Sequence, residues 1–286
     1  MGLPFRSKAL VMNPDELGSD PRPGMDLAVS LGISGLEIRT AHGTNALLLP
    51  TEGLRGLRDM AENRGLAVVA LASPLWKWCR PGATPGRVDS FGFPTEIPPD
   101  DRSMWIERAI GAAVILGAPL VRVFSHLRVA LESTERFVDD PLLGTALDAA
   151  ERAGVRLLLE NEPVCTVAQA DLLLEALQRH HGRGLGLWLD VANLHEVGQA
   201  DPETVRSLAP YVGYVHVKDY RSAPDGRRSF CPAGEGCVPY DTVLPLLADA
   251  CPVVPYALET HVRDGPAAAL AAGAAFLRST LPGGVL

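Results

Sequence analysis

The sequence predicts a (β/α)₈ TIM barrel, an α/β fold formed by a single domain that covers residues 1–286. Eight short apolar segments, each typical of a buried strand, recur along the chain. Helical segments separate them, and strict alternation of strand and helix indicates a parallel sheet. A chain of 286 residues that is 47% hydrophobic can bury one large core, and single barrels of roughly 250 residues are common.

The expected elements follow one another in strand–helix units. The predicted strands span residues 8–13, 35–40, 67–73, 120–125, 155–162, 185–190, 212–219 and 253–261. The clearest helices span residues 101–117, 134–154, 167–181, 239–250 and 266–281, and most of them end at Gly or Pro. Eight such units close into a barrel more readily than they form an open sheet. The first strand–helix turn has no GxGxxG fingerprint, so we reject a dinucleotide-binding fold.

Three phrases, ENRGLAV, ILGAPLV and ERAGVRL, join a helix to the next strand in the same way. In each phrase we expect Gly65, Gly117 or Gly154 to adopt the left-handed conformation that ends a helix. At the other, C-terminal ends of the strands, two loops are long and span residues 74–100 and 220–238. Long loops on that face of a barrel usually serve the active site.

The charge balance favours a protein that acts on a small molecule. The 34 acidic residues outnumber the 26 basic ones, whereas a nucleic-acid groove usually needs a basic face. No run of about 18 apolar residues occurs, and the first residues, MGLPFRSKALVMNP, lack the apolar core of a signal peptide. Five cysteines form no CxxC pair, which fits a reducing compartment. We therefore expect a cytoplasmic protein with no nucleic-acid or membrane partner.

Ionisable residues occur at or near the ends of four successive apolar strands. They are Glu160, Asp190, His216 and Glu259. A barrel interior is filled by apolar layers, so charged groups in these strands need a specific reason. Side chains alternate along a strand, and each of the four shares a side with the apolar residue two positions earlier. All four can therefore face the barrel mouth together.

Such a cluster predicts a metal site. Three carboxylates about 4 Å apart repel by roughly 4 kcal/mol per pair at an effective dielectric near 20, which is comparable to the total stability of a protein. A bound cation reverses that sign. Three carboxylates and one imidazole suit a single divalent ion, Mn²⁺, Mg²⁺ or Co²⁺, with a catalytic Zn²⁺ as the alternative. One such residue alone is more often a helix cap or an ion-pair partner, but four on consecutive strands favour the metal.

Short motifs surround these residues: LENEP at Glu160, LDVANLHEVG at Asp190, HVKD from His216, GEG at residues 234–236 and LETH at Glu259. Together they resemble the xylose isomerase-like TIM-barrel superfamily of sugar isomerases and epimerases, over essentially the whole chain. The resemblance implies that the four residues bind one divalent metal and that Glu160 and Glu259 also serve as acid and base. Relatives often pair through their barrels, which makes a homodimer or homotetramer the expectation.

The implied reaction is isomerisation or epimerisation of a ketose, sugar phosphate, inosose or small hydroxy-keto acid. Removing the proton beside a ketone and a hydroxyl gives an enediolate, which a metal chelated by both oxygens stabilises. If Glu160 and Glu259 flank the substrate on opposite faces, one can remove the proton while the other returns it, which is epimerisation. Return to the neighbouring carbon gives aldose–ketose isomerisation.

Three other functions remain open. Loss of a β-hydroxyl from the same intermediate gives a dehydratase acting on a cyclic keto-polyol or a dehydroshikimate-like acid. The superfamily also contains endonuclease IV, an abasic-site nuclease whose three zinc ions need further histidines. Asn193 stands where some members have a histidine, and this counts against the nuclease together with the acidic balance. A barrel that binds a sugar without turnover is the last alternative.

Six residues are predicted to contact the substrate: Arg39, Trp76, Asn193, His195, Lys218 and Arg221. Lys218 and Arg221 follow a metal-binding strand and can bind a phosphate or carboxylate. Trp76 belongs to a long loop and can cover the sugar face, although packing beneath the loop is the alternative. Arg39 shares a strand with Glu37, for which we favour a structural role.

Overall fold

Eight parallel strands close into a barrel in the computed structural model, which describes residues 8–79, 90–129 and 136–281. Around the barrel the strands follow the order β1-β12-β9-β8-β7-β6-β5-β2. They are β1 (Leu10–Met12), β2 (Gly35–Ile38), β5 (Ala67–Leu71), β6 (Leu120–Val123), β7 (Arg156–Glu160), β8 (Gly186–Asp190), β9 (Val212–Val217) and β12 (Tyr256–Leu258). The predicted (β/α)₈ fold is confirmed.

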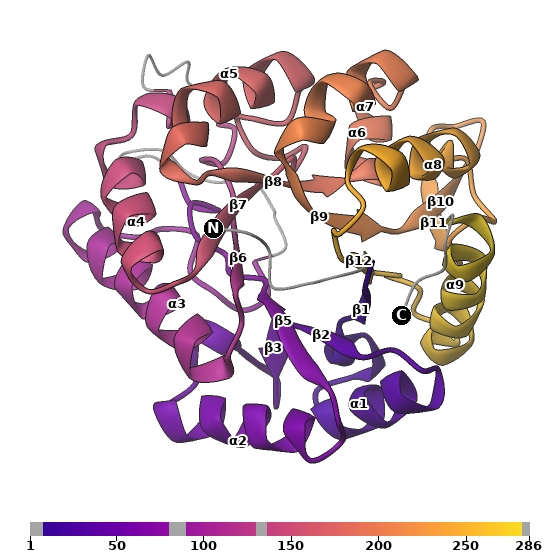
Figure 1. The fold of residues 1–286 in the computed structure, drawn as a ribbon, viewed down its shortest axis with the longest axis horizontal. Helices are drawn as coiled ribbons and strands as arrows, with labels where there is room; N and C mark the ends of the chain where they lie inside the picture. The colour runs from indigo at the N-terminus through magenta and orange to yellow at the C-terminus, as the bar shows by residue number, and fades with distance from the viewer. Residues whose placement is uncertain (1–7, 80–89, 130–135, 282–286) are drawn as a thin grey trace.

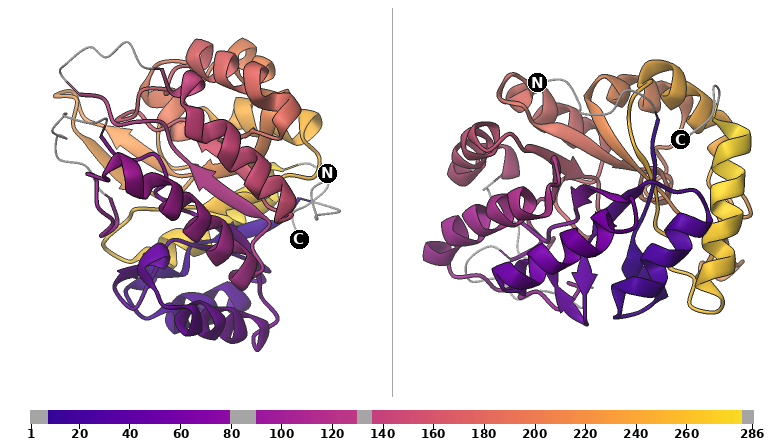
Figure 2. Two further views of the ribbon diagram at one scale, coloured as in Figure 1. Left: turned by 90° about the vertical axis from the view of Figure 1, so that its left-hand side faces the viewer. Right: turned by 60° about the horizontal axis from the view of Figure 1, so that its bottom comes forward.

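Helices form a layer outside the strands in every view (Figures 1 and 2). The α-helices are α1 (Pro21–Ser30), α2 (Thr51–Glu62), α3 (Arg102–Leu116), α4 (Pro141–Arg152), α5 (Ala170–His180), α6 (Val191–Glu196), α7 (Pro202–Leu208), α8 (Tyr240–Ala250) and α9 (Pro266–Thr280). Short 3₁₀ helices are η1 (Pro14–Leu17), η2 (Ala46–Leu48), η3 (Pro99–Asp101), η4 (Phe137–Asp139), η5 (His181–Arg183) and η6 (Ala209–Tyr211). Within the three described ranges, no helix has the length and apolar character needed to span a bilayer.

Two hairpins lie outside the barrel sheet. They pair β3 (Thr40–Ala41) with β4 (Thr44–Asn45), and β10 (Asp219–Ser222) with β11 (Arg228–Cys231). The second hairpin follows β9 directly, so it lies at the C-terminal ends of the barrel strands. The sequence predicts a long loop at residues 220–238, and in the structure residues 220–222 and 228–231 of that loop form paired strands.

Local signals explain where the elements begin and end. Gly65, Gly117 and Gly154 all have positive φ, between 70° and 74°, as the three repeated phrases predict. The last strand starts later than predicted because Pro255 has no N–H to donate, and the ladder starts where the Tyr256 amide donates to Ala9. The strand also ends earlier than predicted, at Leu258, so that Glu259 directly follows it. The fourth helix starts later than predicted, because the chain first forms η4 and α4 then begins at a Pro whose preceding residue, Asp140, caps the helix. Residues 134 and 135 of that predicted helix lie outside the described residues.

The barrel interior holds its own apolar cluster, separate from the core between strands and helices. Its members include Leu158, Trp188, Tyr214 and Ala257, which come from β7, β8, β9 and β12. Each lies two residues before one of the four predicted metal ligands. Alternation along the strands therefore places the ligands on the same inner side, one layer closer to the barrel mouth.

The packing of α1 on the 3₁₀ helix η1 gives a first prediction. A Cβ at Gly24 would lie 2.5 Å from the Cα of Pro14 and closer still to its carbonyl oxygen, and backbone atoms cannot move aside cheaply. Gly24→Ala should therefore lower the free energy of unfolding by about 1–3 kcal/mol. Gly111→Ala is the matched control, because this exposed position in α3 has no atom near a built Cβ, and it should stabilise by about 0.5–1 kcal/mol. Urea denaturation measures both, and equal effects would contradict the close contact.

Candidate functional site

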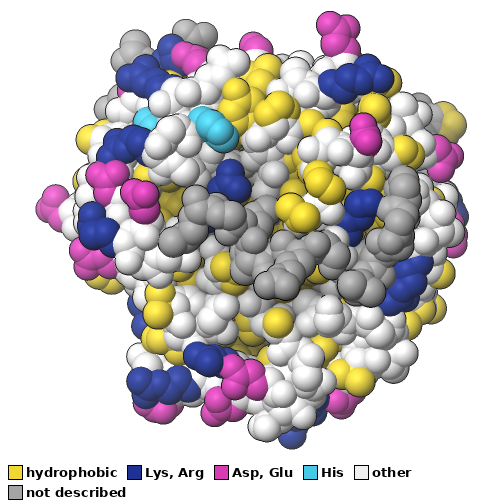
Figure 3. Space-filling view, viewed as in Figure 1, with side chains coloured by type: hydrophobic (Ala, Val, Ile, Leu, Met, Phe, Trp, Pro, Cys, Tyr) yellow, Lys and Arg dark blue, Asp and Glu magenta, His cyan; other side chains and the backbone are white. Residues whose placement is uncertain are grey.

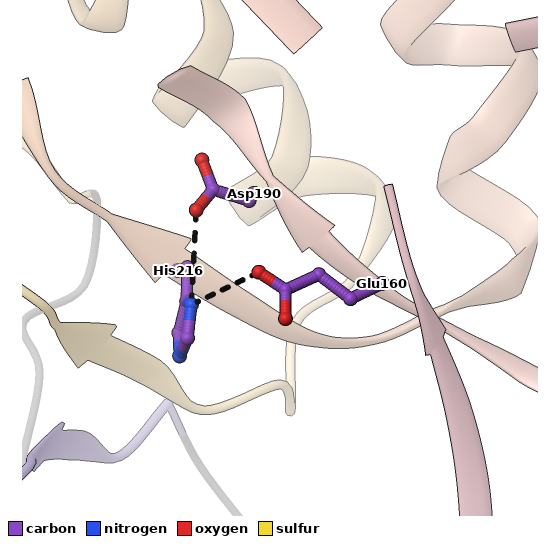
Figure 4. Close-up of side chains that lie close together, drawn as sticks. All are labelled: Glu160, Asp190 and His216. Atoms are coloured by element: carbon purple, nitrogen blue, oxygen red, sulfur yellow. Dashed lines mark ion pairs between the residues drawn. The ribbon is translucent and has the colours of Figure 1, made fainter. Parts of the chain in front are cut away.

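Four buried ionisable side chains meet inside the mouth of the barrel. The Nδ1 atom of His216 lies 3.6 Å from Oε1 of Glu160, 3.7 Å from Oδ2 of Asp190 and 3.4 Å from Oε2 of Glu259. None of the four residues is more than 4% exposed. Figure 4 shows the imidazole nitrogen facing the carboxylates of Glu160 and Asp190. The structure thus brings together the four residues that the sequence predicts as metal ligands.

The donor atoms fit a divalent ion. The Nδ1 atom of His216 is buried and has no hydrogen-bond partner among the described residues, although three carboxylates surround it. One ligand atom each from Glu160, Asp190 and His216 lies within 4.8 Å of the other two. An ion about 2.1 Å from each of four tetrahedral ligands would separate those ligands by about 3.4 Å. The arrangement is therefore consistent with a divalent metal, without indicating which one.

Buried cations also surround the carboxylates. Lys218 Nζ lies 2.7 Å from Asp190 Oδ2 and 3.3 Å from Glu259 Oε2. Arg39 Nη1 lies 2.7 Å from Glu259 Oε1. The sequence predicts that a bound metal compensates the repulsion between the carboxylates. In the structure, the protein's own Lys218 and Arg39 compensate part of that repulsion.

Arg122 is a cation that the sequence analysis missed. It comes from β6, lies 2% exposed, and places Nη1 3.0 Å from Glu160 Oε2. Its other nitrogens donate to the carbonyl oxygens of Ser73 and Ala72. The available signal was a single Arg within the apolar run LVRVF.

These charges determine the protonation of the carboxylates. Burial raises the pKa of Glu160, but the positive charge of Arg122 and that of the His216 ring in its protonated form outweigh it, and the net pKa is lowered. The pKa of Asp190 is lowered in the same way, since Lys218 and His216 outweigh its burial. Burial likewise raises the pKa of Glu259, but His261, His216 and Lys218 hold it well below its usual value. The three carboxylates are therefore ionised at neutral pH and available as ligands or bases.

The other ring nitrogen of His216 faces a fourth carboxylate. Nε2 donates to Oε2 of Glu37 over 2.8 Å. Glu37 also accepts from the hydroxyl of Tyr214 at 2.9 Å and from the amide of Asn13 at 3.2 Å. The structural role predicted for Glu37 thus includes a hydrogen bond to the ring of a candidate metal ligand.

A pocket of about 410 Å³ opens above this cluster. Its size falls in the range typical of small-molecule sites. Its lining includes the aromatic rings Phe91, Phe124, Tyr220 and Phe230, the cations Lys77, Arg122, Lys218 and Arg228, the carboxylates Glu160, Glu162, Glu196 and Glu259, and Asn193 and His261. A second hollow, of about 480 Å³, borders the N-terminal ends of β6 and β7 and the 3₁₀ helix η5, away from the candidate ligands. The pocket at the barrel mouth is therefore the candidate substrate site, because the candidate ligands Glu160 and Glu259 line it.

Two of the six predicted substrate contacts, Asn193 and Lys218, line this pocket. Asn193 is 5% exposed, and its Nδ2 has no hydrogen-bond partner among the described residues, so it can donate to a bound molecule. Lys218 is held between two of the carboxylates. Arg39, which is not among the pocket-lining residues, lies behind Glu259 and also pairs with Asp15 at 2.8 Å.

The other three predicted contacts do not line the pocket in the described part of the chain. Trp76 is fully buried, stacks on Trp78 with ring centroids 5.7 Å apart, and donates its Nε1–H to an Asp in the loop before α4. This placement matches the packing alternative rather than a lid. His195 is hydrogen-bonded to the hydroxyl of Tyr220, a pocket-lining residue, at 2.8 Å. Arg221 is exposed and pairs with Glu235 in the GEG turn after β11.

Asp219, the last residue of the motif HVKD, is hydrogen-bonded to the GEG turn. Its Oδ2 accepts from the backbone amides of Gly234 and Gly236, and its Oδ1 accepts from those of Tyr220 and Val238. A Cβ at Gly236 would overlap this carboxylate. One buried carboxylate thus fixes the base of the β10–β11 hairpin, which carries Tyr220 and two further pocket residues.

Basic side chains are not gathered on the face shown in Figure 3, where Lys and Arg are interspersed with Asp and Glu. This pattern on one face agrees with the acidic net charge of −8.

Known proteins share this fold. A family model described as xylose isomerase-like TIM barrel matches residues 25–280, whereas a search of curated proteins finds no match. Similar solved structures include the IolI protein with a bound zinc atom, which is 18% identical with a TM-score of 0.75 over 96% of this chain and 98% of that one. D-Psicose 3-epimerase with D-tagatose from Clostridium cellulolyticum H10 is 14% identical, with a TM-score of 0.72 over 96% and 99%. The probable 3-DHS dehydratase AsbF from Bacillus anthracis, involved in petrobactin synthesis, is 18% identical, with a TM-score of 0.71 over 94% and 98%.

The site predicts stoichiometric metal binding that depends on His216. After reconstitution with Mn²⁺ and removal of loosely held ion, elemental analysis should find about one equivalent in the wild type. His216→Ala should lose it, because the only nitrogen ligand is removed. His181→Ala is the control, since it deletes an exposed imidazole that borders the hollow at the other end. Full retention of metal by His216→Ala would show that this cluster is not the binding site.

Proposed function

The chain belongs to the xylose isomerase-like TIM-barrel family, and on that premise we propose that it is a divalent-metal-dependent isomerase or epimerase. Its substrate would be a hydroxy ketone: a ketose, a sugar phosphate, an inosose or a small hydroxy-keto acid. The observation that carries the proposal is the bare Nδ1 of His216, which faces three carboxylates at 3.4 to 3.7 Å beneath a pocket of sugar size.

Glu160, Asp190, His216 and Glu259 would hold the ion. When bound, it would supply Lewis acidity that stabilises negative charge on two adjacent substrate oxygens. The protein's own cations have a separate task. Arg122 beside Glu160, and Lys218 beside Glu259, keep these carboxylates ionised, so that either can accept a proton.

Proton transfer would use the two glutamates. One carboxylate takes the proton from the carbon that bears the hydroxyl, and the electron pair of that C–H bond moves toward the ketone oxygen. Return of a proton to the opposite face gives the epimer, and return to the neighbouring carbon gives the isomer. Glu259 has a route for reprotonation, because His261 Nε2 lies 3.2 Å from its Oε2 and the His261 side chain is 28% exposed. Glu160 lines the same pocket beside Arg122 and would serve as the other acid or base.

The remaining pocket residues would bind and enclose the substrate. Asn193 and Lys218 offer donors to its oxygens, while the aromatic rings of the lining pack against its carbon atoms and exclude water. In this proposal Arg39 and His195 act through Glu259 and Tyr220, respectively. Arg221 and Trp76 support the loops that surround the pocket.

A dehydratase is the second candidate, and the similarity to AsbF favours it. The same base would remove the proton, and a neighbouring acid would protonate the departing hydroxyl. Lys218 and His261 both lie beside Glu259 and offer such a proton. An abasic-site nuclease is a weaker candidate, because Asn193 stands where some members of the superfamily have a histidine.

Solvent exchange tests the proposed chemistry. In D₂O with Mn²⁺, NMR should show loss of the α-proton signal of at least one member of a panel of ketoses, inososes and hydroxy-keto acids. Glu160→Gln and Glu259→Gln should each slow this exchange by roughly 10²- to 10⁴-fold, because general-base catalysis is lost. Glu203→Gln, at an exposed position in α7, should exchange at the wild-type rate. An enone absorbance without isomer formation would instead select the dehydratase, and an unchanged rate in both active-site variants would refute the assignment of the glutamates.

A further inference from the structure

Glu37 reaches across the barrel interior to the candidate metal site. It comes from β2, and two strands, β1 and β12, separate β2 from β9 around the barrel. Its side chain is 1% exposed, and its oxygens are hydrogen-bonded to His216, Tyr214 and Asn13. Glu37 is not among the residues that line the pocket.

Glu37 differs from the other carboxylates of the site in its partners. Glu160, Asp190 and Glu259 each pair with a Lys or Arg. Among the described residues, Glu37 has no Lys or Arg partner, and its one ion-pair partner is His216, which is charged only when its ring is protonated. A buried carboxylate needs a compensating partner, and in this case the imidazole ring supplies it. The carboxylate of Glu37 therefore contacts the Nε2 side of that ring.

The two nitrogens of His216 consequently have different surroundings. Nε2 is occupied by Glu37 at 2.8 Å, while Nδ1 is the atom with no hydrogen-bond partner that faces the three carboxylates. Turning the ring over would break the contact with Glu37. The ring is also packed edge-on against Trp188, with centroids 5.0 Å apart. Its orientation is thus fixed from behind by a hydrogen bond and from the side by packing.

We propose that Glu37 is a positioning residue for the metal site. By accepting a hydrogen bond from the Nε2–H of His216, it selects the tautomer in which the Nδ1 lone pair is available to a divalent cation. The same hydrogen bond makes Nδ1 a stronger electron-pair donor to the metal. Histidines that bind metals commonly have such a carboxylate behind them. The inference rests on the metal site of the proposed function, but not on which reaction the site catalyses.

The competing role is that Glu37 only braces the barrel interior through Tyr214 and Asn13. The two roles differ in what they change. A brace affects the stability of the apoprotein and leaves its affinity for metal intact, whereas a positioning residue changes the affinity itself.

The test is a calorimetric titration of the purified protein with Mn²⁺ and, separately, Zn²⁺. Glu37→Gln keeps the shape and an acceptor oxygen but removes the charge, and it should weaken binding by roughly 10- to 100-fold. Tyr214→Phe is the matched control, because it removes another hydrogen bond to the same Glu37 oxygen while leaving the contact to His216. It should keep the wild-type Kd even if it lowers the Tm of the apoprotein.

A second variant covers the case in which Glu37→Gln does not fold. Glu37→Asp keeps the buried charge but shortens the side chain by one methylene, so it too should weaken binding. Imidazole ¹⁵N spectra with diamagnetic Zn²⁺ should show Nε2 protonated and Nδ1 bound to the metal in the wild type, with a smaller share of that form in the variants at the same Zn²⁺ concentration.

The outcomes separate the two proposals. Wild-type affinity in a folded Glu37 variant would overturn the positioning role and leave the proposed function intact. Absence of stoichiometric binding by the wild type itself would overturn the metal-dependent function, and with it the role of Glu37.

Discussion

Four buried carboxylates around one imidazole impose the constraint on which the rest of the site depends. Glu37, Glu160, Asp190 and Glu259 are all nearly inaccessible to water, and ions in such surroundings are costly unless they are paired. The chain meets this requirement in two ways. Arg39, Arg122 and Lys218 neutralise the outer sides of the cluster, while its centre is left to the bare nitrogen of His216.

This division determines what each strand contributes. Glu160, Asp190 and His216 come from β7, β8 and β9, and Glu259 directly follows β12. Glu37 in β2, Arg39 just after β2 and Arg122 in β6 each contact one of these candidate ligands. Arg39 joins Glu259 across 220 positions of sequence. Such contacts form only when the barrel is closed, so closure of the sheet and assembly of the site are one event.

The contrast between Glu160 and Trp76 shows how far the sequence could predict the site. The positions of the ligands follow from local rules, because apolar runs define strands and alternation within each run decides which side chains face inward. Barrel topology then brings the ends of adjacent strands together. No such rule applies to the long side chain of Trp76, whose destination depends on how a loop folds over its neighbours. The partners of Arg122 and Glu37 were likewise hidden, since a single charged residue in an apolar run does not reveal which residue lies opposite it.

Four backbone amides donate hydrogen bonds to Asp219 and hold the base of the β10–β11 hairpin. This anchor separates the candidate metal centre from part of the pocket lining within a few residues of chain. His216 lies just before this anchor, and the pocket residues Arg228 and Phe230 lie beyond it on the hairpin. Changes in the length or composition of the hairpin between its anchored ends can therefore reshape the pocket while the chemical centre keeps its geometry. In a lineage of related barrels, this is a place where new substrates can be acquired without the catalytic apparatus being rebuilt.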